Sequence, residues 1–580
     1  MMKLKPWHCR ILLALAVLVV YYPSLHAGYN SVDDMGMIDR ISNAGPVNIR
    51  HLFFPHGTGY YYRPLTILTF FFDRFAWGTI PSFMHLENIL IHLGSVLLVF
   101  AITRRIASLY DVKGQGVAFF AGLLFALHPL ATEAVCWISD RTDLLSGLLV
   151  LMTLWLMIAA LQEHRKSLLL MSGVTLLFGC LAKETAVFVL PGLLWFVVVF
   201  PEKGIPLVRR LRRRWLALGM PTLAITVYFI MRHMALARDT GIKTALTGVI
   251  TSANFDLLNK TRVALKVYGF YFKKLFVPWP LNFAIIEVSN WYVLGGILLV
   301  VVLCWLAIRA DLLGALGLMG FCVLSPALLV PFSRMAWTPI GERYLYVTIA
   351  LVAPLAAILI FQQRKRLAPF RQRWAVGALT LLLAVFFTTT LHRAWIWQNN
   401  VRLYTDTSAK SPDFVAAKTE LASALIARGR TAEAQAILAA LHEENNSGGY
   451  VVDDLNFAQV LTSQGKLKEA RKVLLGSIDK NPKERYQMLQ ALLKVNDLRC
   501  GKTTDLAVRL KIQKESLAWL YEEQKIRPQT FTLYRIAKQQ LAMGHRKEAL
   551  KSFKDAYARA PENAFYRGAA ATFIKRLEGS

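Results

Sequence analysis

The chain has 580 residues, 55% of them apolar, and a formal net charge of +30. A soluble core of this size needs far fewer apolar residues, so the composition excludes an ordinary soluble enzyme and indicates contact with lipid. The positive charge lies in short blocks between apolar runs, which is typical of membrane topology and not of a nucleic-acid-binding surface. The six cysteines are scattered and predict neither a disulfide framework nor a metal site.

Uncharged runs recur along the first two thirds of the chain and approach the ~20 residues that a helix needs to cross a bilayer. The clearest runs are residues 11–20, 89–100, 144–161, 187–200, 297–308 and 375–387. The basic blocks between runs are residues 3–10, 104–105, 164–166, 209–214, 309 and 364–373. Placing every basic block on the cytoplasmic side predicts about eleven spans, with the N-terminus inside and the C-terminus outside.

Two apolar segments leave alternatives open. The first run is expected to be an uncleaved anchor, although residues 24–27 (SLHA) faintly resemble a signal-peptide cleavage site. Residues 263–283 are expected to form a helix at the outer interface and not a span. They contain three lysines and the breaker Pro278-Trp279-Pro280, and a span here would turn the later basic blocks outward.

The composition changes after Trp397 to amphipathic helical periodicity, so we predict a membrane domain at residues 1–396 and a soluble domain at residues 397–580. The soluble domain repeats one spacing of Gly, Ala and Pro, typical of the tetratricopeptide repeat of about 34 residues. The copies are Gly429 with Ala434, Gly465 with Ala470 and Pro482, and Gly544 with Ala549 and Pro561. Stacked helix pairs of this kind form a concave surface suited to extended peptide. A plain helical bundle is the alternative.

Two adjacent carboxylates, Asp33 and Asp34, follow the first span within the longest early non-cytoplasmic loop, residues 28–86. Charge at a bilayer exit is costly unless it is used or hydrated. Transfer of a sugar from a lipid phosphate to a hydroxyl needs one base for the acceptor proton, whereas the phosphate leaves as an anion and needs no acid. Arg63, further along the loop, follows tyrosines that offer stacking faces for a sugar. Alternatively, the aspartates cap the helix predicted at residues 35–42.

A second polar cluster follows the third predicted span, on the same predicted side as the acidic pair. Its candidates for substrate binding are His128, Glu133, Asp140, Arg141 and Asp143. Pro129 is expected to end the third helix, and the carboxylates can bind an acceptor, a metal ion or the neighbouring arginine. Capping of the fourth helix by Asp140 or Asp143 remains the alternative.

Two later loops supply further charged candidates on this side. Lys183 and Glu184 lie between two apolar runs, where charge indicates an intramembrane site or a local ion pair. Arg334, Glu342 and Arg343 occupy the next outer loop, where guanidinium groups can hold a phosphate by two parallel hydrogen bonds. Snorkelling towards lipid headgroups explains a basic residue at a membrane edge equally well.

In chain order, these residues resemble the transmembrane and tetratricopeptide-repeat O-mannosyltransferase-like family, within the GT-C class of polytopic glycosyltransferases that use polyprenyl-phosphate sugars. The resemblance spans nearly the whole chain, and residues 268–279, including Lys274, also resemble a family segment. The motifs that carry it are Val32-Asp33-Asp34, Tyr62-Arg63-Pro64-Leu65, Leu127-His128-Pro129, Thr132-Glu133-Ala134-Val135, Asp140-Arg141-Thr142-Asp143, Lys183-Glu184 and Gly341-Glu342-Arg343-Tyr344-Leu345-Tyr346. The implied fold is all-α, a GT-C-like membrane helical bundle followed by a tetratricopeptide-repeat solenoid.

The resemblance implies that the acidic pair supplies the catalytic carboxylate, so Asp33 or Asp34 is the base, and position favours Asp33. It implies a polyprenyl-phosphate-linked sugar donor and a hydroxyl acceptor, expected to be protein, with inversion at the sugar. The repeat domain is expected to bind the acceptor or a partner protein. Membrane lipids are the other expected partners, and no nucleic acid is expected. No cofactor is assigned, and a divalent cation remains open.

The short loops and about four or five repeat units favour a bacterial inner membrane with the repeats in the periplasm. An endoplasmic reticulum membrane with luminal repeats gives the same pattern. The competing function is a non-catalytic membrane anchor that presents the repeats to an envelope assembly or secretion machine. A transporter would need charge near the bilayer centre and matching halves, and the sequence shows neither strongly.

Overall fold

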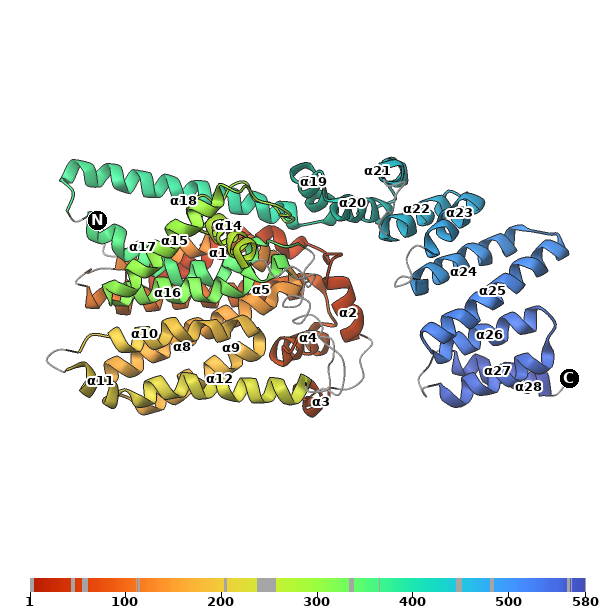
Figure 1. Ribbon diagram of the computed structural model, residues 1–580, viewed down its shortest axis with the longest axis horizontal. Helices are drawn as coiled ribbons and strands as arrows, with labels where there is room; N and C mark the ends of the chain where they lie inside the picture. The colour runs from red at the N-terminus through yellow and green to blue at the C-terminus, as the bar shows by residue number, and fades with distance from the viewer. Residues whose placement is uncertain are drawn as a thin grey trace. The chain divides into compact units, whose positions relative to one another are not determined.

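The computed structural model describes residues 5–42, 47–54, 61–110, 112, 115–202, 206–236, 257–332, 338–364, 366–444, 451–479, 485–560, 564 and 566–578. The chain forms two compact units, Met1–Phe414 and Val415–Ser580 (Figure 1). Throughout the described ranges the regular structure is helical, apart from one isolated antiparallel bridge between Ile285 and Ile340. The all-α prediction is confirmed.

The first unit is a bundle of apolar helices joined by short helical turns. Its α-helices are α1 (Pro6–Tyr21), α2 (Asp34–Ser42), α3 (Ile49–Phe53), α4 (Pro64–Trp77), α5 (Pro81–Leu109), α6 (Gln115–Ala126), α7 (Ala131–Cys136), α8 (Arg141–Glu163), α9 (Lys166–Ala182), α10 (Leu190–Val199), α11 (Leu207–Arg213), α12 (Trp215–Leu236), α14 (Leu257–Phe276), α15 (Tyr292–Arg309), α16 (Leu312–Leu324), α17 (Tyr346–Arg364), α18 (Pro369–Trp397) and α19 (Asn400–Lys410). The short 3-10 turns are η1 (Tyr22–His26), η2 (Ile138–Asp140), η3 (Glu184–Val189), η4 (Ser325–Leu328), η5 (Val330–Phe332) and η6 (Glu342–Leu345).

Proline begins several of the long helices. It is the first residue of α1, α4, α5 and α18, where its missing N–H costs no hydrogen bond and its fixed φ suits the helix. Eight helical segments among the described residues are long and apolar enough to cross a membrane. The sequence predicted about eleven spans, and three further apolar segments of this unit, containing α6, α9 and α10, are shorter, with 10–17 residues each.

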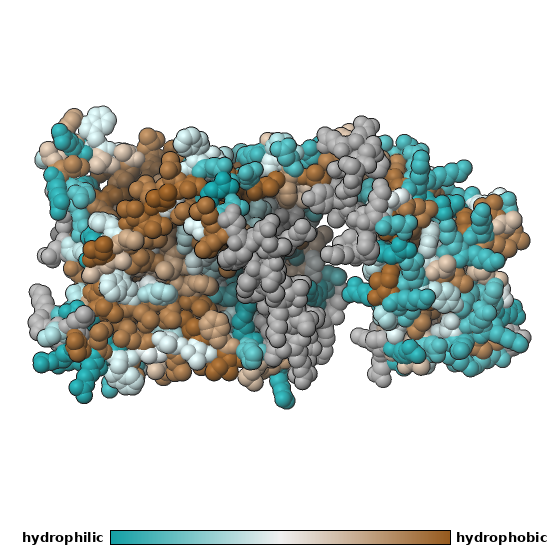
Figure 2. Space-filling view, in the orientation of Figure 1, coloured by the Kyte–Doolittle hydropathy of each residue, from teal (hydrophilic) through white to brown (hydrophobic). Residues whose placement is uncertain are grey.

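The helices of the bundle divide into a buried centre and a lipid-facing rim. In the span containing α8, 67% of the most apolar window is buried inside the protein, whereas the figure is 11% for α18. The exposed residues of the rim helices are large and apolar, such as Trp305, Leu298 and Leu381. Figure 2 shows apolar side chains gathered over this unit. Lipid is the environment that such a surface requires.

Helix α14 has a different character from the spans. It carries five lysine and arginine residues, and it is absent from the apolar helices found in the described part of the chain. Figure 1 shows it nearly end-on, while α8, α12 and α16 run across the page. It packs closely on α15, since a Cβ added at Gly269 would lie 1.8 Å from the carbonyl oxygen of Tyr292. These observations support the prediction that this segment is not a span.

The division between the units falls after Phe414, whereas composition placed it at residue 397. Helix α19 accounts for the difference, because its side chains bond to loops of the membrane unit. Asn400, Tyr404 and Lys410 all make such bonds. Amphipathic periodicity shows that a helix has one buried face but does not show what covers that face.

The second unit is a series of antiparallel helix pairs with a mainly hydrophilic surface in Figure 2. Its helices are α20 (Val415–Ala427), α21 (Thr431–Glu444), α22 (Val451–Ser463), α23 (Leu467–Ile478), α24 (Arg485–Lys502), α25 (Leu506–Ile526), α26 (Thr530–Ala542), α27 (Arg546–Arg559) and α28 (Arg567–Glu578). Contacts join α20 to α21, α22 to α23, α24 to α25 and α26 to α27.

The repeated Gly and Ala residues occupy equivalent places in three of these pairs. Gly429, Gly465 and Gly544 have φ of 75°, 76° and 85°, the left-handed conformation that ends a helix and that glycine adopts without strain. Ala434, Ala470 and Ala549 are fully buried where the second helix meets the first. Pro482 and Pro561 lie outside the described residues. The tetratricopeptide assignment remains an interpretation of this repeated pattern.

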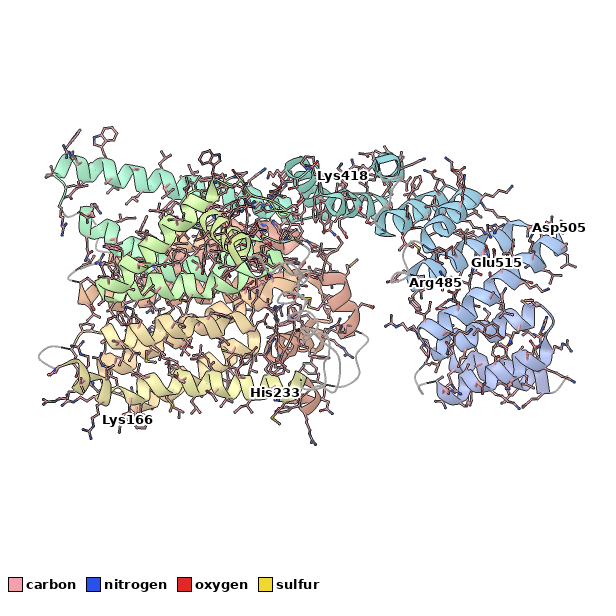
Figure 3. All side chains as sticks on the ribbon, in the orientation of Figure 1. Lys166, His233, Lys418, Arg485, Asp505 and Glu515 are labelled. Carbon is pink, nitrogen blue, oxygen red and sulfur yellow. The ribbon has the colours of Figure 1, made fainter. Side chains whose placement is uncertain are left out.

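Polar contacts also link neighbouring pairs of the second unit. Glu515 on α25, labelled in Figure 3, accepts a hydrogen bond from Asn496 of α24 at 3.0 Å and forms an ion pair with Arg471 of α23. The cores of this unit are formed by its own helices, for example around Leu474 and Leu489. It therefore has the buried interior expected of an independent domain.

Candidate active site

The loop after the first span carries the acidic pair, and the two carboxylates have different surroundings. Asp34 is buried at the start of α2 and accepts three hydrogen bonds, from the backbone N–H of Asn30 at 2.9 Å, the backbone N–H of Ser139 at 2.8 Å and the hydroxyl of Ser139 at 2.5 Å. Burial raises the pKa of the Asp34 carboxyl to about 6, although these hydrogen bonds lower it. Through the two hydrogen bonds from Ser139, Asp34 links its own loop to the turn η2.

Asp33 is exposed, and its carboxylate has no hydrogen bond or ion pair with any of the residues that the structure describes. Burial raises the pKa of Asp33, while the positive charges of Arg343 and Arg63 oppose that rise. A carboxylate that has no direct partner among the described residues and that feels the charge of two guanidinium groups can accept a proton from a substrate. Of the acidic pair, Asp33 is therefore the better candidate for a base.

Glu133 and Arg343 form an ion pair at the centre of the cluster, although 210 residues separate them. Glu133 on α7 accepts from Nη1 of Arg343 at 2.6 Å and from the backbone N–H of Arg343 at 3.2 Å. The guanidinium lies 5.1 Å from the ring centre of Trp137 and 4.8 Å from that of Tyr344. Burial raises the pKa of Glu133, and the charge of Arg343 opposes the rise. The ion pair and the two rings fix the position of the guanidinium.

The carboxylates before α8 face Lys183, which begins the loop after α9. Nζ of Lys183 lies 2.5 Å from Oδ2 of Asp143 and 5.7 Å from the ring centre of Tyr344. Asp140 lies close to Asp143, Lys183 and Arg343, and its buried Oδ2 has no hydrogen-bond partner among the described residues. This part of the cluster therefore holds one paired and one unpaired carboxylate.

Arg63 and Glu184 form a bidentate ion pair, with Nε to Oε2 at 2.9 Å and Nη2 to Oε1 at 2.6 Å. The guanidinium lies 4.3 Å from the ring centre of Tyr61, so the tyrosine beside it is a stacking partner of the cation. Arg63 also contributes positive charge at Asp33 and at Asp143. The local ion pair considered from the sequence for Glu184 is present, and its partner is Arg63.

Arg141 is part of a separate, fully buried network. Its Nη1 lies 2.7 Å from Asp73 and 2.9 Å from Glu87, Nε donates to Asn88 at 2.9 Å, and Nη2 donates to the carbonyl of Met84 at 3.1 Å. All three guanidinium nitrogens are bonded within the protein, which fits a structural role better than the substrate-binding role inferred from sequence. Sequence reasoning missed Asp73, although a carboxylate within an apolar helix requires a partner.

The remaining candidates lie around the cluster or beyond what the structure describes. His128 is buried against Phe386, with ring centres 5.0 Å apart, and accepts weakly from the N–H of Leu130 at 3.4 Å. Lys274 pairs with Glu342 at 2.6 Å, and both side chains are buried. Their contacts are structural. Arg334 lies outside the described residues.

The structure thus brings together charged residues from five separate parts of the sequence. Contacts and charge interactions link Asp33, Arg63, Glu133, Asp140, Asp143, Lys183, Glu184 and Arg343. Each of the three cations has one carboxylate partner, which leaves Asp33 and Asp140 as the carboxylates without an ion pair among the described residues. Asp33 is the more exposed of the two. Figure 1 places α2 and α4, which flank the site, at the end of the bundle away from the N-terminus.

A group of three or more His, Cys, Asp or Glu side chains that could hold a metal ion is absent from the described ranges. The chemistry that the arrangement supports directly is removal of a proton by a carboxylate beside two cations that can attract an anionic group. The fold and the site together define an integral membrane protein of the polytopic, all-helical class with a charged cluster at one end of its bundle.

Comparison with known proteins shows sequence similarity over part of the membrane unit. A family model described as dolichyl-phosphate-mannose-protein mannosyltransferase matches residues 83–232. Human protein O-mannosyl-transferase TMTC1 is 40% identical over 92 residues, which is 16% of this chain and 10% of that protein. Human TMTC4 is 38% identical over 114 residues, covering 18% and 15%, and Drosophila melanogaster Tmtc3 is 36% identical over 102 residues, covering 15% and 11%.

Over these stretches the chain is similar to protein O-mannosyltransferases, the class that the motifs resemble. The matched stretches span between 10% and 15% of the length of these three relatives. Among solved structures, an oligosaccharyltransferase from Archaeoglobus fulgidus aligns with a TM-score of 0.36 and 12% identity, over 67% of this chain and 53% of that one. At this score, the similarity does not distinguish one helical membrane fold from another.

Proposed function

We propose that this protein is a membrane glycosyltransferase that moves a sugar, expected to be mannose, from a polyprenyl-phosphate donor to a hydroxyl group of a protein. The observation that carries the proposal is Asp33, an exposed carboxylate without an ion pair among the described residues, within the influence of the charges of Arg343 and Arg63. The names of the relatives and of the matching family support the class of reaction and of acceptor.

The proposed reaction needs two things from the protein. Asp33 takes the proton of the acceptor hydroxyl while its oxygen forms a bond to the sugar carbon that bears the phosphate. The bond from that carbon to the phosphate oxygen breaks, and the lipid phosphate leaves as an anion. Attack opposite the leaving group inverts the configuration at the sugar.

The three cations of the cluster, Arg63, Lys183 and Arg343, are suited to binding the phosphate group that leaves. An arginine has five N–H donors, and Arg343 uses its two terminal nitrogens on Glu133 and Tyr344. Its charge is held beside Asp33 by the aromatic rings of Trp137 and Tyr344, so the site needs little rearrangement to receive an anion. Lys183 and Arg63 add positive charge around the same carboxylates.

The membrane-anchored scaffold, the competing function, would not need an unpaired carboxylate in this cluster. Burying charge is expensive, and a scaffold would be as stable with apolar residues at these positions. Among the described residues, Asp33 and Asp140 of the cluster have no ion pair, which favours the enzyme.

The experiment that tests the proposal uses the purified full-length protein in detergent with a panel of radiolabelled polyprenyl-phosphate sugars and a serine- and threonine-containing peptide. We expect label to pass from one donor, mannose first, to the peptide, or slowly to water when the peptide is omitted. The same protein denatured by heat is the control. Absence of both transfer and donor hydrolysis with every sugar would contradict the enzyme and favour the scaffold.

A further inference from the structure

Helix α19, which follows the last span, makes direct contact with the loop that carries Asp33. The hydroxyl of Tyr404 lies 2.8 Å from that of Ser31 and donates to Oδ1 of Asn30 at 3.2 Å. Nδ2 of Asn400 donates to the carbonyl of Tyr29 at 3.0 Å. Tyr404 is fully buried. Three consecutive residues of the loop are therefore held from one helix.

These contacts act on the turn that presents Asp33. Oδ1 of Asn30 also accepts from the backbone N–H of Val32 at 2.9 Å, and the N–H of Asn30 donates to Asp34. Asn30 thus closes the turn around Asp33, and the hydroxyl of Tyr404 bonds to the same amide oxygen. A hydrogen-bonded network of buried groups of this kind fixes a single geometry.

The other end of α19 contacts the segment that supports Arg343. Nζ of Lys410 donates to the carbonyl of Leu281 at 2.8 Å, and Nδ2 of Asn282 donates to the hydroxyl of Ser411 at 2.8 Å. The backbone N–H of Asn282 donates to Glu342, the residue before Arg343, at 3.1 Å. One short helix, α19, therefore contacts both the loop that carries Asp33 and the segment that supports Arg343.

Aromatic packing makes the same connection. The ring of Tyr404 lies 6.3 Å from that of Phe283, and Phe283 packs edge-on against Trp137 at 5.4 Å. Trp137 is the ring over which the guanidinium of Arg343 lies. A side chain of α19 is therefore joined to the cation of the site by two successive ring contacts.

We propose that α19 is a positioning element of the site and that the hydroxyl of Tyr404 sets the place of Asp33 relative to Arg343. The proposal rests on the proposed function, since it assigns a role towards the base named there. Tyr404 is a positioning residue because it acts on the proposed base through its hydrogen bonds to Asn30 and Ser31. A displacement of a base by about 1 Å can lower turnover by up to about 100-fold.

The test is Tyr404→Phe, which removes one hydroxyl and keeps the ring. We expect kcat for transfer from polyprenyl-phosphate mannose to a peptide to fall about 10-fold with an unchanged KM for the donor, because donor contacts are retained. The control is Tyr110→Phe, which removes a hydroxyl that accepts from the backbone of Leu313 elsewhere in the bundle. We expect the control to turn over like the wild type.

Two further measurements separate positioning from a general loss of structure. In an Asp33→Asn background, Tyr404→Phe should cause no further loss, because the base it positions is already absent. If Tyr404→Phe fails to fold, Ser31→Ala removes the opposite partner and should lower kcat in the same way.

The inference is overturned if both Tyr404→Phe and Ser31→Ala keep the wild-type kcat, or if Tyr404→Phe lowers residual activity equally with and without Asp33. Its failure is distinguishable from failure of the proposed function. Normal transfer by Asp33→Asn itself would contradict the proposed function, whereas an inactive Asp33→Asn with a normal Tyr404→Phe would contradict only the role of α19.

Discussion

Two arginines of the membrane unit, Arg141 and Arg343, lie in charged clusters that differ in one respect. Arg141 is fully buried, and each of its guanidinium nitrogens is bonded to the protein. Arg343 pairs with Glu133 on one side, but on the other it faces Asp33, a carboxylate without an ion pair among the described residues. Both arginines belong to motifs that the sequence marked as binding substrate.

The difference shows how charged residues that stabilise the fold of a membrane domain can be distinguished from charged residues that can take part in a reaction. A buried arginine whose guanidinium nitrogens are all bonded to the protein holds helices together and is costly to remove. A cluster that leaves an accessible carboxylate beside a cation has an unused proton acceptor, which is the property that acid–base chemistry requires. Four predictions test this comparison.

The largest effect is expected from Arg141→Met, which leaves Asp73 and Glu87 without their cation. Uncompensated buried charge of this kind costs about 3–5 kcal/mol. We expect the purified variant to unfold at a much lower temperature, or to fail to accumulate. Arg309→Met, which breaks a partly exposed pair with Asp311, is the control and should cost less than about 1 kcal/mol. If Arg141→Met keeps the wild-type stability but no longer binds the donor, then Arg141 binds substrate, as expected from the sequence.

The second effect concerns the charge of Arg343, compared in Arg343→Gln and Arg343→Lys. Loss of the cation should lower kcat/KM on the order of 100-fold, as removal of a donor to developing charge does. The cation lowers the pKa of Asp33, so Arg343→Gln should raise that pKa and move the acidic limb of the pH–rate profile to higher pH.

Arg343→Lys keeps the charge but loses the forked contact, so it should lower kcat/KM about 10-fold and leave the acidic limb in place. The measurement is the pH–rate profile of all three proteins. Identical acidic limbs in Arg343→Gln and the wild type would show that Asp33 and Arg343 do not interact.

The third prediction compares two truncations. A chain ending at Phe414 keeps α19 and should transfer sugar to a small peptide at the wild-type rate, while transfer to the natural protein acceptor falls. A chain ending at Trp397 also loses α19 and should transfer to the peptide about 10-fold more slowly, because the Asp33 loop loses its contacts. Equal rates from the two truncated proteins would show that α19 has no role in the site.

The smallest effect is expected from Ser139→Ala, which removes the hydroxyl that donates to Asp34 but keeps the backbone N–H that also donates. Loss of one such hydrogen bond costs about 1 kcal/mol. We expect a slightly lower unfolding temperature and a kcat within a few-fold of the wild type. If Ser139→Ala loses as much activity as Arg343→Gln, then Ser139 takes part directly in the reaction and does not only support the loop.

The sequence predicted part of the set of residues that gather in the cluster, because these residues lay near the ends of predicted spans on one side. Asp33, Glu133, Asp143, Lys183 and Arg343 were all assigned to one side, and the structure joins them in one cluster. The hydropathy pattern predicted the membrane bundle with about eleven spans, whereas eight helices in the described part of the chain are long and apolar enough to be spans.

The pairing within the cluster was not predictable from one sequence. Glu133 and Arg343 are 210 residues apart, and Arg63 and Glu184 are 121 apart, so only the packing of the bundle decides which charges meet. Arg141 was assigned to substrate because its partner Asp73 lies on another helix. The same limit explains α19, whose polar contacts with the loops are invisible to helical periodicity.

The central claim is that Asp33 and not Asp34 is the catalytic base, and the most direct test measures transfer and unfolding temperature for Asp33→Asn and Asp34→Asn together. Asp33→Asn keeps size and polarity, so we expect wild-type stability and a loss of turnover of about 10²–10⁴-fold. Asp34→Asn disturbs three hydrogen bonds, so we expect lower stability and a smaller loss of turnover. Normal turnover of a stable Asp33→Asn protein would contradict the account.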